Sequence, residues 1–208
     1  AGAQIIASAS DLYSKSDMIV KVKEPQESEY QLLKEGQVLF AFLHLAPDPL
    51  QAAALLERKV IGIAYETITD TEGRLPLLTP MSEIAGRIAI QVGATALQIA
   101  NGGKGVLLGG VPGVAPGKVV VIGGGVVGTE ALRMALGLGA DVTVLDTNLS
   151  RLRALDALYG PRLKTLYSSP QALDESLKTA DLVIGAVLIP GKLAPKLITR
   201  QHLKTMSP

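Results

Sequence analysis

The sequence predicts an α/β protein with parallel strands, and three observations lead to this fold class. Apolar runs of strand length alternate with stretches of helical apolar spacing along most of the chain. The 22 glycines gather in clusters, as tight turns between strands and helices require. Hydrophobic residues make up 48% of the 208 residues and aromatic residues only 3%, which suits aliphatic strands buried on both faces. We therefore expect a doubly wound parallel sheet together with part of a second α/β domain.

Composition also excludes several classes of function. The chain has 20 basic and 19 acidic residues and no basic block, which argues against nucleic acid as a partner. It has no cysteine, which excludes disulfides and cysteine-based metal sites, and we expect no metal site of another kind. Glycine, proline or charge interrupts every apolar run before it reaches membrane-spanning length. We expect a soluble, cytoplasmic protein without a membrane partner.

Residues 1–80 carry one alternating unit, which we interpret as a partial α/β domain. Helices are expected from near Ser10 and over Pro49–Arg58. Residues 81–101 are expected to form a connecting helix, with Ser82 as its N-cap. The strands expected in this half are, in chain order, Ile5–Ile6, Met18–Val22, Val38–Leu43 and Val60–Tyr65.

Residues 102–208 form the clearer unit, in which Val106–Leu108 is short enough for a hairpin strand. The strands expected after it are Val119–Ile122, Asp141–Asp146, Leu163–Tyr167 and Asp181–Val187. The helices expected between and after them are Val126–Leu138, Leu149–Leu158, Pro170–Lys178 and Thr199–Met206. A doubly wound sheet continues with another strand at this point, so we expect a domain that is incomplete at its C-terminus, in a chain cut at both ends.

The glycine segment between the first strand and first helix of this unit has the form Gly-x-Gly-x-x-Gly. It runs from Gly123 to Gly128 and directly follows an apolar strand. Gly123 permits the tight turn, Gly125 lets the backbone approach a pyrophosphate, and Gly128 allows close packing of helix on strand. The helix then offers unpaired N–H groups and a partial positive charge to phosphates. In this context the motif predicts a Rossmann-type site for a nicotinamide dinucleotide.

Asp146 ends the following strand, 18 residues after Gly128. A carboxylate there accepts hydrogen bonds from ribose hydroxyls and repels a 2′-phosphate, which favours NAD over NADP. Arg151 lies nearby, and a basic group can accommodate that phosphate. The structural alternative is a glycine turn in a non-binding protein, with Asp146 a solvated strand end.

Seven segments of the chain resemble one family of enzymes, the L-alanine dehydrogenases. The resemblance extends essentially from end to end and includes the fold of the NAD-binding subunit of proton-translocating transhydrogenases. The segments are Val20–Pro25, Phe42–Leu45, Ile63–Thr67, Leu77–Ser82, Lys104–Gly128, Ala180–Gly191 and Ala194–Lys196.

The resemblance implies reversible NAD-dependent oxidative deamination of L-alanine to pyruvate and ammonia. Lys23 matches the family's substrate-binding lysine and His44 its catalytic histidine. A lysine can hold the carboxylate of pyruvate or alanine, and a histidine suits proton transfer near neutral pH. The positions that match dinucleotide contacts are Ser82, Val126, Val127, Asp146, Arg151, Ser168, Val187 and Leu188.

The same resemblance implies parts that this chain lacks. Family members carry an arginine for the substrate carboxylate upstream and a catalytic aspartate downstream, and they form homohexamers. We therefore expect these 208 residues alone to be inactive or nearly so. The segments Val106–Leu108 and Ser82–Ala100 are candidates for the hexamer interface.

Each singled-out residue also has a structural interpretation. His44 could be a core histidine at a strand end. Lys23 alone could be an ordinary strand-end lysine, but we assign that structural role to the nearby Lys21 instead. Glu66 stays open between a structural and a catalytic role, and His202 is expected to be solvated.

Two other functions compete with the dehydrogenase. One is a transhydrogenase subunit that passes hydride to an NADP-carrying partner, and the other is an NAD-binding module without chemistry. The presence of both Lys23 and His44 argues against the module, which needs neither.

Overall fold

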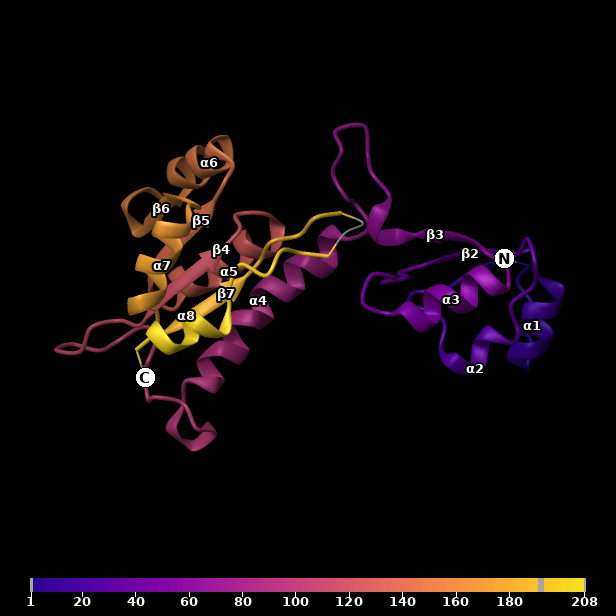
Figure 1. The fold of residues 1–208 in the computed structure, drawn as a ribbon, viewed down its shortest axis with the longest axis horizontal. Coiled ribbons are helices and arrows are strands. Elements are labelled where there is room, and N and C mark those ends of the chain that lie inside the picture. Colours follow the sequence, from indigo (N-terminus) through magenta and orange to yellow (C-terminus); the bar gives the residue numbers. More distant parts are fainter. Residues whose placement is uncertain (1, 191–192, 208) are drawn as a thin grey trace. The chain divides into compact units, whose positions relative to one another are not determined.

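The computed structural model describes residues 2–190 and 193–207, which form two compact units (Figure 1). The first unit holds the residues up to Leu78 together with Pro190 and Leu193. The second runs from Thr79 to Ile189 and resumes at Ala194. Each unit contains its own parallel sheet and its own buried core, so the α/β expectation is confirmed for both.

The first unit is built on a three-stranded parallel sheet of order β1-β2-β3. Its strands are β1 (Met18–Val20), β2 (Val38–Ala41) and β3 (Ile61–Ala64). Its helices are α1 (Ala9–Lys15), α2 (Glu27–Tyr30), α3 (Pro49–Glu57) and the 3₁₀ turn η1 (Tyr65–Thr67). Leu39, fully buried on the central strand, lies opposite Ile19 and Gly62, and the core gathers around it from both neighbouring strands.

Two expectations for this unit need correction. Ile5–Ile6 forms no strand, and Ile5 is 97% exposed, because an apolar pair alone has no neighbouring strand to bond with. The strands expected to extend to Val22, Leu43 and Tyr65 are shorter in the structure. The strands end at Val20, Ala41 and Ala64, although one backbone hydrogen bond beyond β1 and β2, from Phe42 N–H to the carbonyl oxygen of Val22 at 3.1 Å, still joins the two segments.

The second unit is a four-stranded parallel sheet of order β6-β5-β4-β7. Its strands are β4 (Lys118–Ile122), β5 (Asp141–Asp146), β6 (Leu163–Tyr167) and β7 (Leu182–Gly185). Its helices are α4 (Thr79–Ala96), α5 (Val126–Gly137), α6 (Leu149–Tyr159), α7 (Pro170–Thr179) and α8 (Arg200–Thr205), with 3₁₀ turns η2 (Ile99–Asn101) and η3 (Gly160–Arg162).

This strand order contains a topological switch point. The chain winds outward from β4 through β5 to β6, then crosses back to place β7 on the other side of β4. Ligands of open α/β sheets bind at the carboxyl ends of the strands where the winding reverses, here β4 and β7. The glycine segment begins at the carboxyl end of β4.

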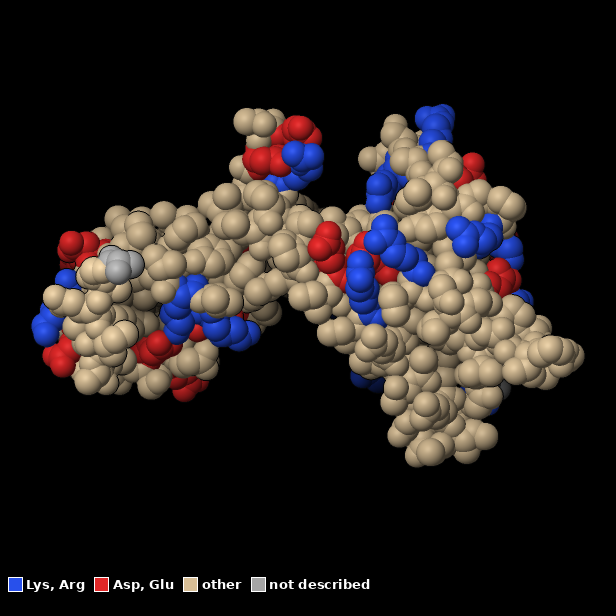
Figure 2. All heavy atoms as spheres, turned by 180° about the vertical axis from the view of Figure 1, so that it is seen from behind, with Lys and Arg blue, Asp and Glu red and all other residues tan. Residues whose placement is uncertain are grey.

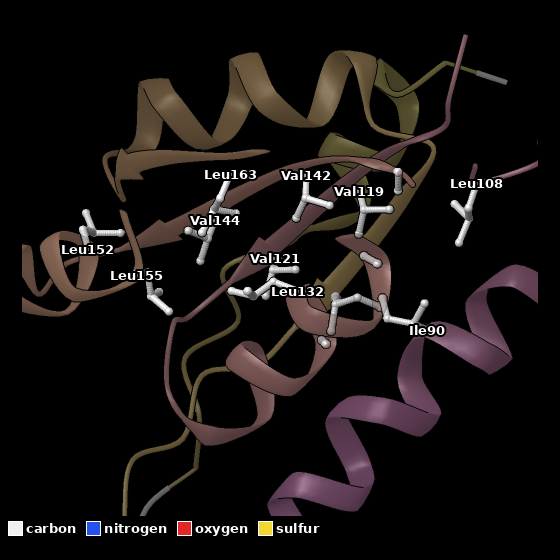
Figure 3. Close-up of a cluster of buried hydrophobic side chains, with 14 of the residues drawn as sticks. Ile90, Leu108, Val119, Val121, Leu132, Val142, Val144, Leu152, Leu155 and Leu163 are labelled. Carbon is white, nitrogen blue, oxygen red and sulfur yellow. The ribbon is translucent and has the colours of Figure 1, made fainter. Parts of the chain in front are cut away.

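Both faces of this sheet are covered, which explains why its strands are apolar without alternation. Val119 and Val121 of β4 join the core shown in Figure 3, together with Leu132 of α5 and Ile90 of α4. The next residues along the strand, such as Val120, point to the opposite face and join the core formed with α7. Figure 3 also shows Leu152 and Leu155 of α6 beside the Val144 end of β5.

Two further expectations are corrected here. The long helix begins at Thr79 and ends at Ala96, so Ser82 lies inside its first turn and is not its N-cap. Val106–Leu108 forms no strand, and Leu108 enters the core from a turn. The hairpin bridge lies a little later, where Val111 and Val114 exchange backbone hydrogen bonds of 3.2 and 2.8 Å.

Three further observations concern surface charge, membrane spans and metal sites. Basic and acidic side chains lie among one another on the face seen in Figure 2, and neither sign forms a continuous field there. Within residues 2–190 and 193–207, no helix is both long and apolar enough to span a membrane. The same residues contain no group of three or more histidine, aspartate or glutamate side chains arranged to hold a metal ion.

Candidate active site

The glycine segment turns the chain sharply from β4 into α5. Gly123 has φ +100°, and a Cβ added there would lie 2.8 Å from the carbonyl oxygen of Ala186. A Cβ added at Gly128 would lie only 1.8 Å from the carbonyl oxygen of Gly123, so the first turn of α5 sits directly on the loop. Both glycines are therefore required by packing within the protein, as the motif predicts.

Gly125 differs from its neighbours because the protein does not fill the space beside it. A Cβ added there would meet no atom within 4 Å, and its φ of −66° is open to other residues. Gly125 is the N-cap of α5, and within the described residues the N–H groups of Gly125, Val126 and Val127 have no hydrogen-bond partner. Free N–H groups beside an open space at a helix N-terminus fit a diphosphate, which a larger residue at Gly125 would crowd.

Asp146 ends β5 beside this loop. Its Oδ2 accepts a 2.6 Å hydrogen bond from the N–H of Gly124, and its Oδ1 accepts one of 2.7 Å from the N–H of Asn148. A carboxylate has about four lone-pair sites, so these bonds leave capacity for ribose hydroxyls. Asp146 thus supports the loop in addition to the ligand-binding role expected from its position.

Arg151 reaches back from α6 to the same loop. Its Nε donates to the carbonyl oxygen of Gly124, and its Nη2 donates to Oγ1 of Thr129. Thr129 Oγ1 in turn donates to the carbonyl oxygen of Gly125 at 2.7 Å. The guanidinium is therefore turned toward the protein backbone.

The other expected dinucleotide contacts border the same edge of the sheet. Ser168 follows β6 and donates its N–H to the carbonyl oxygen of Asp146 at 3.0 Å. Val187 follows β7, and its Cγ2 would lie 3.1 Å from a Cβ added at Gly123. Leu188 is 58% exposed and Val126 is 41% exposed.

Ser82 lies one helical turn before Gly86 on α4. A Cβ added at Gly86 would lie 2.2 Å from the carbonyl oxygen of Val127, so the two helices cross closely at that point. Residues four apart share a helix face, which places Ser82 on the side of α4 that meets the first turn of α5.

A second group of polar side chains gathers in the first unit, at the carboxyl edge of its sheet. Lys23 follows β1, His44 follows β2 and Glu66 follows β3. In a parallel sheet the residues that follow neighbouring strands lie at one edge, so the topology brings these three segments together.

Glu24 joins two of these side chains, a role for which the sequence analysis found no signal. Its Oε1 lies 2.8 Å from Lys23 Nζ, and its Oε2 lies 3.1 Å from His44 Nδ1. The hydrogen bond from Lys23 is the main reason that the pKa of Glu24 falls to about 2, with a smaller lowering from His44. Glu24 is therefore ionised at neutral pH and can only accept, so Nδ1 of His44 carries a hydrogen and Nε2 is the nitrogen open to a substrate.

Glu66 fixes the backbone of His44. Its carboxylate accepts the N–H of His44 at 2.6 Å and the N–H of Leu43 at 3.2 Å. His44 has φ +49°, a left-handed conformation that costs a residue with a side chain about 1–3 kcal/mol. The ring stacks on Phe42 with centroids 5.9 Å apart, and its side chain is 47% exposed, which does not fit a core histidine.

The remaining polar residues singled out from the sequence have partners of their own. Lys21 pairs with Glu29 at 2.5 Å, and Glu29 also accepts from Tyr13 OH at 3.0 Å, which is consistent with the structural role expected of Lys21. The expectation that His202 is solvated is wrong, because its side chain is only 21% exposed. Its Nδ1 accepts the N–H of Thr199, and its Nε2 lies 3.1 Å from Asp174.

Comparison with known families shows to which family the chain belongs. Residues 1–85 match the family described as "Alanine dehydrogenase/PNT, N-terminal domain", and residues 89–208 match "Alanine dehydrogenase/PNT, C-terminal domain". The chain belongs to the alanine dehydrogenase/PNT family. Its fold and its nicotinamide dinucleotide cofactor follow from that membership.

Members of this family with curated names are similar over the whole chain. Alanine dehydrogenase of Methanococcus maripaludis is 54% identical over 208 residues, which is 100% of this chain and 56% of that protein. Alanine dehydrogenase 2 of Staphylococcus aureus is 56% identical over 206 residues, which is 99% of this chain and 55% of that protein. The chain thus spans a little over half the length of the curated relatives it matches.

Solved structures of the alanine dehydrogenase/PNT family agree with the fold. A structure of L-alanine dehydrogenase superposes with a TM-score of 0.84 at 50% identity, over 99% of this chain and 57% of that chain. The transhydrogenase from Sinorhizobium meliloti superposes with a TM-score of 0.76 at 25% identity, over 97% of this chain and 59% of that chain.

Proposed function

We propose that this chain is part of an L-alanine dehydrogenase that uses NAD and interconverts L-alanine with pyruvate and ammonia. The observation that carries the proposal is the Lys23–Glu24–His44 cluster, in a chain more than half identical to enzymes of that name. A module that only binds a dinucleotide has no use for such a cluster. In this assignment residues 1–80 belong to the substrate domain, 81–101 to the connecting helix and 102–208 to the dinucleotide domain.

In this proposal the residues of the first unit handle the substrate. Lys23 attracts the substrate carboxylate and shares its charge with Glu24. His44, with Nδ1 held by Glu24, moves protons at Nε2 as the substrate carbonyl exchanges with an imine. Glu66 keeps the histidine backbone in the conformation that aims the ring. The bound dinucleotide supplies or accepts the hydride.

In the second unit, the N–H groups around Gly125 hold the diphosphate and Asp146 receives the ribose. The preference for NAD over NADP rests on the charge of Asp146, which disfavours a 2′-phosphate at the same place. Ser82, Ser168, Val187 and Leu188 are proposed as further contacts on the resemblance to the family.

The test is oxidation of NADH with pyruvate and ammonium by the full-length protein, with NADPH in a parallel assay. The expected result is turnover that needs both substrates, prefers NADH, and falls about 10²–10⁴-fold in His44→Ala. His202→Ala, which alters the chain's other histidine on α8, is the matched control and should keep its activity.

Two outcomes would contradict the proposal. If pyruvate and ammonium support no turnover but a second dinucleotide accepts the hydride, the protein is a transhydrogenase component. If NADH binds and neither reaction occurs, the chain is a binding module.

The assembly is a separate part of the proposal. The family resemblance implies a homohexamer, which light scattering on the purified full-length protein would detect. A monomer at all concentrations tested would remove this part and leave the activity proposal intact.

A further inference from the structure

We propose that Arg151 is a positioning residue of the dinucleotide loop, which it clamps together with Asp146, and that it does not receive the 2′-phosphate of NADP. The inference rests on the proposed function, because it concerns the same loop. It differs from the expectation drawn from sequence, in which a basic residue at this position raised the prospect of NADP.

The clamp closes on Gly124 from both sides. Asp146 accepts the N–H of Gly124 at 2.6 Å, and Arg151 Nε donates to the carbonyl oxygen of the same residue. The two peptide groups that flank Gly124 are therefore fixed by side chains of opposite charge from β5 and α6. A Cβ added at Gly124 would lie 2.9 Å from Leu155 Cδ1, 3.3 Å from Asp146 Oδ2 and 3.4 Å from Arg151 Cγ, so the side chains of the clamp pack closely around this residue.

Thr129 extends the clamp to the next peptide. It receives Arg151 Nη2 on its Oγ1 and donates from that oxygen to the carbonyl of Gly125. The carbonyl oxygens of Gly124 and Gly125 are thus both directed to protein donors. This matters for an anion site, since a carbonyl oxygen turned toward a phosphate would repel it, whereas the N–H groups of Gly125 to Val127 stay available.

The same bonds weigh against a role in recognising a 2′-phosphate. Nε and Nη2 are the edge with which a guanidinium grips an anion in a bidentate manner, and in Arg151 both donate into the loop. Releasing them to a phosphate would leave the carbonyl of Gly124 without this charged donor.

The test measures the dissociation constants of NADH and NADPH, by fluorescence titration, for the full-length protein and for Arg151→Ala. The clamp predicts that both constants rise by a similar factor, about tenfold or more, so that their ratio stays unchanged. Thr129→Val, which removes one arm of the clamp, should raise both constants by a smaller factor. Arg153→Ala is the matched control, because Arg153 is exposed on the same helix and should leave both constants unchanged.

The outcomes separate the inference from the proposed function. Selective loss of NADPH affinity in Arg151→Ala, with NADH affinity retained, would overturn the clamp and assign Arg151 to the 2′-phosphate. Unchanged constants for both dinucleotides would overturn it as well. If the unmodified protein binds neither dinucleotide, the proposed function itself fails. Circular dichroism of each variant checks that a loss of affinity does not arise from unfolding. The conservative variant Arg151→Lys is measured in the same way.

Discussion

Three carboxylates hold the two candidate sites in shape. Glu24 bridges Lys23 and His44, Glu66 fixes the backbone of His44, and Asp146 holds the N–H of Gly124. Each of them pairs with protein groups at distances of 2.6 to 3.1 Å. Precise placement of a reacting group by a supporting neighbour is a large part of what a protein contributes to catalysis.

The lowered pKa of Glu24 predicts a specific dependence of stability on pH. Its pKa is about 2 in the folded protein against an ordinary value of 4.5, so the unfolded chain binds a proton more readily. Ionised Glu24 therefore stabilises the fold above pH 4.5, and this contribution is lost as the pH falls toward 2. Glu24→Gln should make the acid loss of stability shallower, as measured by denaturant unfolding at several pH values in this range.

Glu57→Gln is the matched control for this prediction, because Glu57 is an exposed acid at the end of α3. It should leave the pH dependence as it is in the unmodified protein. Equal slopes for Glu24→Gln and the unmodified protein would show that the Lys23–Glu24 pair contributes nothing to folding.

At this scale the sequence could identify residues but not their partners. Lys23 and His44 stood out because their local motifs resemble a family, and Asp146 because its distance from the glycine segment is diagnostic. The role of Glu24 depends on its contact with His44, which lies 20 residues later in the chain. The orientation of Arg151 depends on its contact with Gly124, which lies 27 residues earlier. Such approaches are set by the packing of the sheet and have no local sequence signal.

Among the elements, the packing of α4 against α5 affects the dinucleotide loop most directly. Figure 1 shows the two helices side by side. At the crossing, a Cβ on Gly86 would lie 2.2 Å from Val127 O and 2.9 Å from Glu130 Cβ. Glu130 is nearly buried beside this contact and pairs with Arg87 at 2.7 Å and Arg133 at 3.1 Å. The crossing thus supports the helix turn that carries the free N–H groups.

Gly86→Ala should consequently destabilise the second unit by about 1–3 kcal/mol, since the helices must separate to admit the methyl group. It should also weaken NADH binding, because Val127 belongs to the turn that would shift. Gly137→Ala at the end of α5, where a Cβ meets nothing within 4 Å, should instead be neutral or stabilising by up to about 1 kcal/mol. Thermal unfolding with and without NADH measures both effects, and equal behaviour of the two variants would contradict the close crossing.

Elements with strong local signals were predicted closely, and those without were not. The expected bounds of β5 and β6 are the observed ones, because glycine or a helix cap limits each apolar run. Val106–Leu108 was misassigned as a strand because a short apolar run looks the same whether it pairs or, as with Leu108, inserts into a core. Ser82 was misassigned as a cap because residues before it also take up the helix.

For the whole molecule, the division into two units places the two candidate sites on separate sheets. The dinucleotide loop belongs to the unit that begins at Thr79, and the Lys23–Glu24–His44 cluster belongs to the unit that ends at Leu78. Alternating strands and helices predicted both parallel sheets, whereas the strand order β6-β5-β4-β7 comes from the structure alone. In the proposed function, the open space at Gly125 receives the diphosphate of NADH.

NADH binding by Gly125→Ala in the full-length protein, measured together with the melting temperature of the variant, tests this diphosphate site. The backbone at Gly125 admits alanine, and the added methyl group would meet no protein atom within 4 Å. The melting temperature should therefore stay unchanged while the dissociation constant for NADH rises at least about tenfold, or about 1.4 kcal/mol. NADH binding as tight as that of the unmodified protein would show that the diphosphate lies elsewhere.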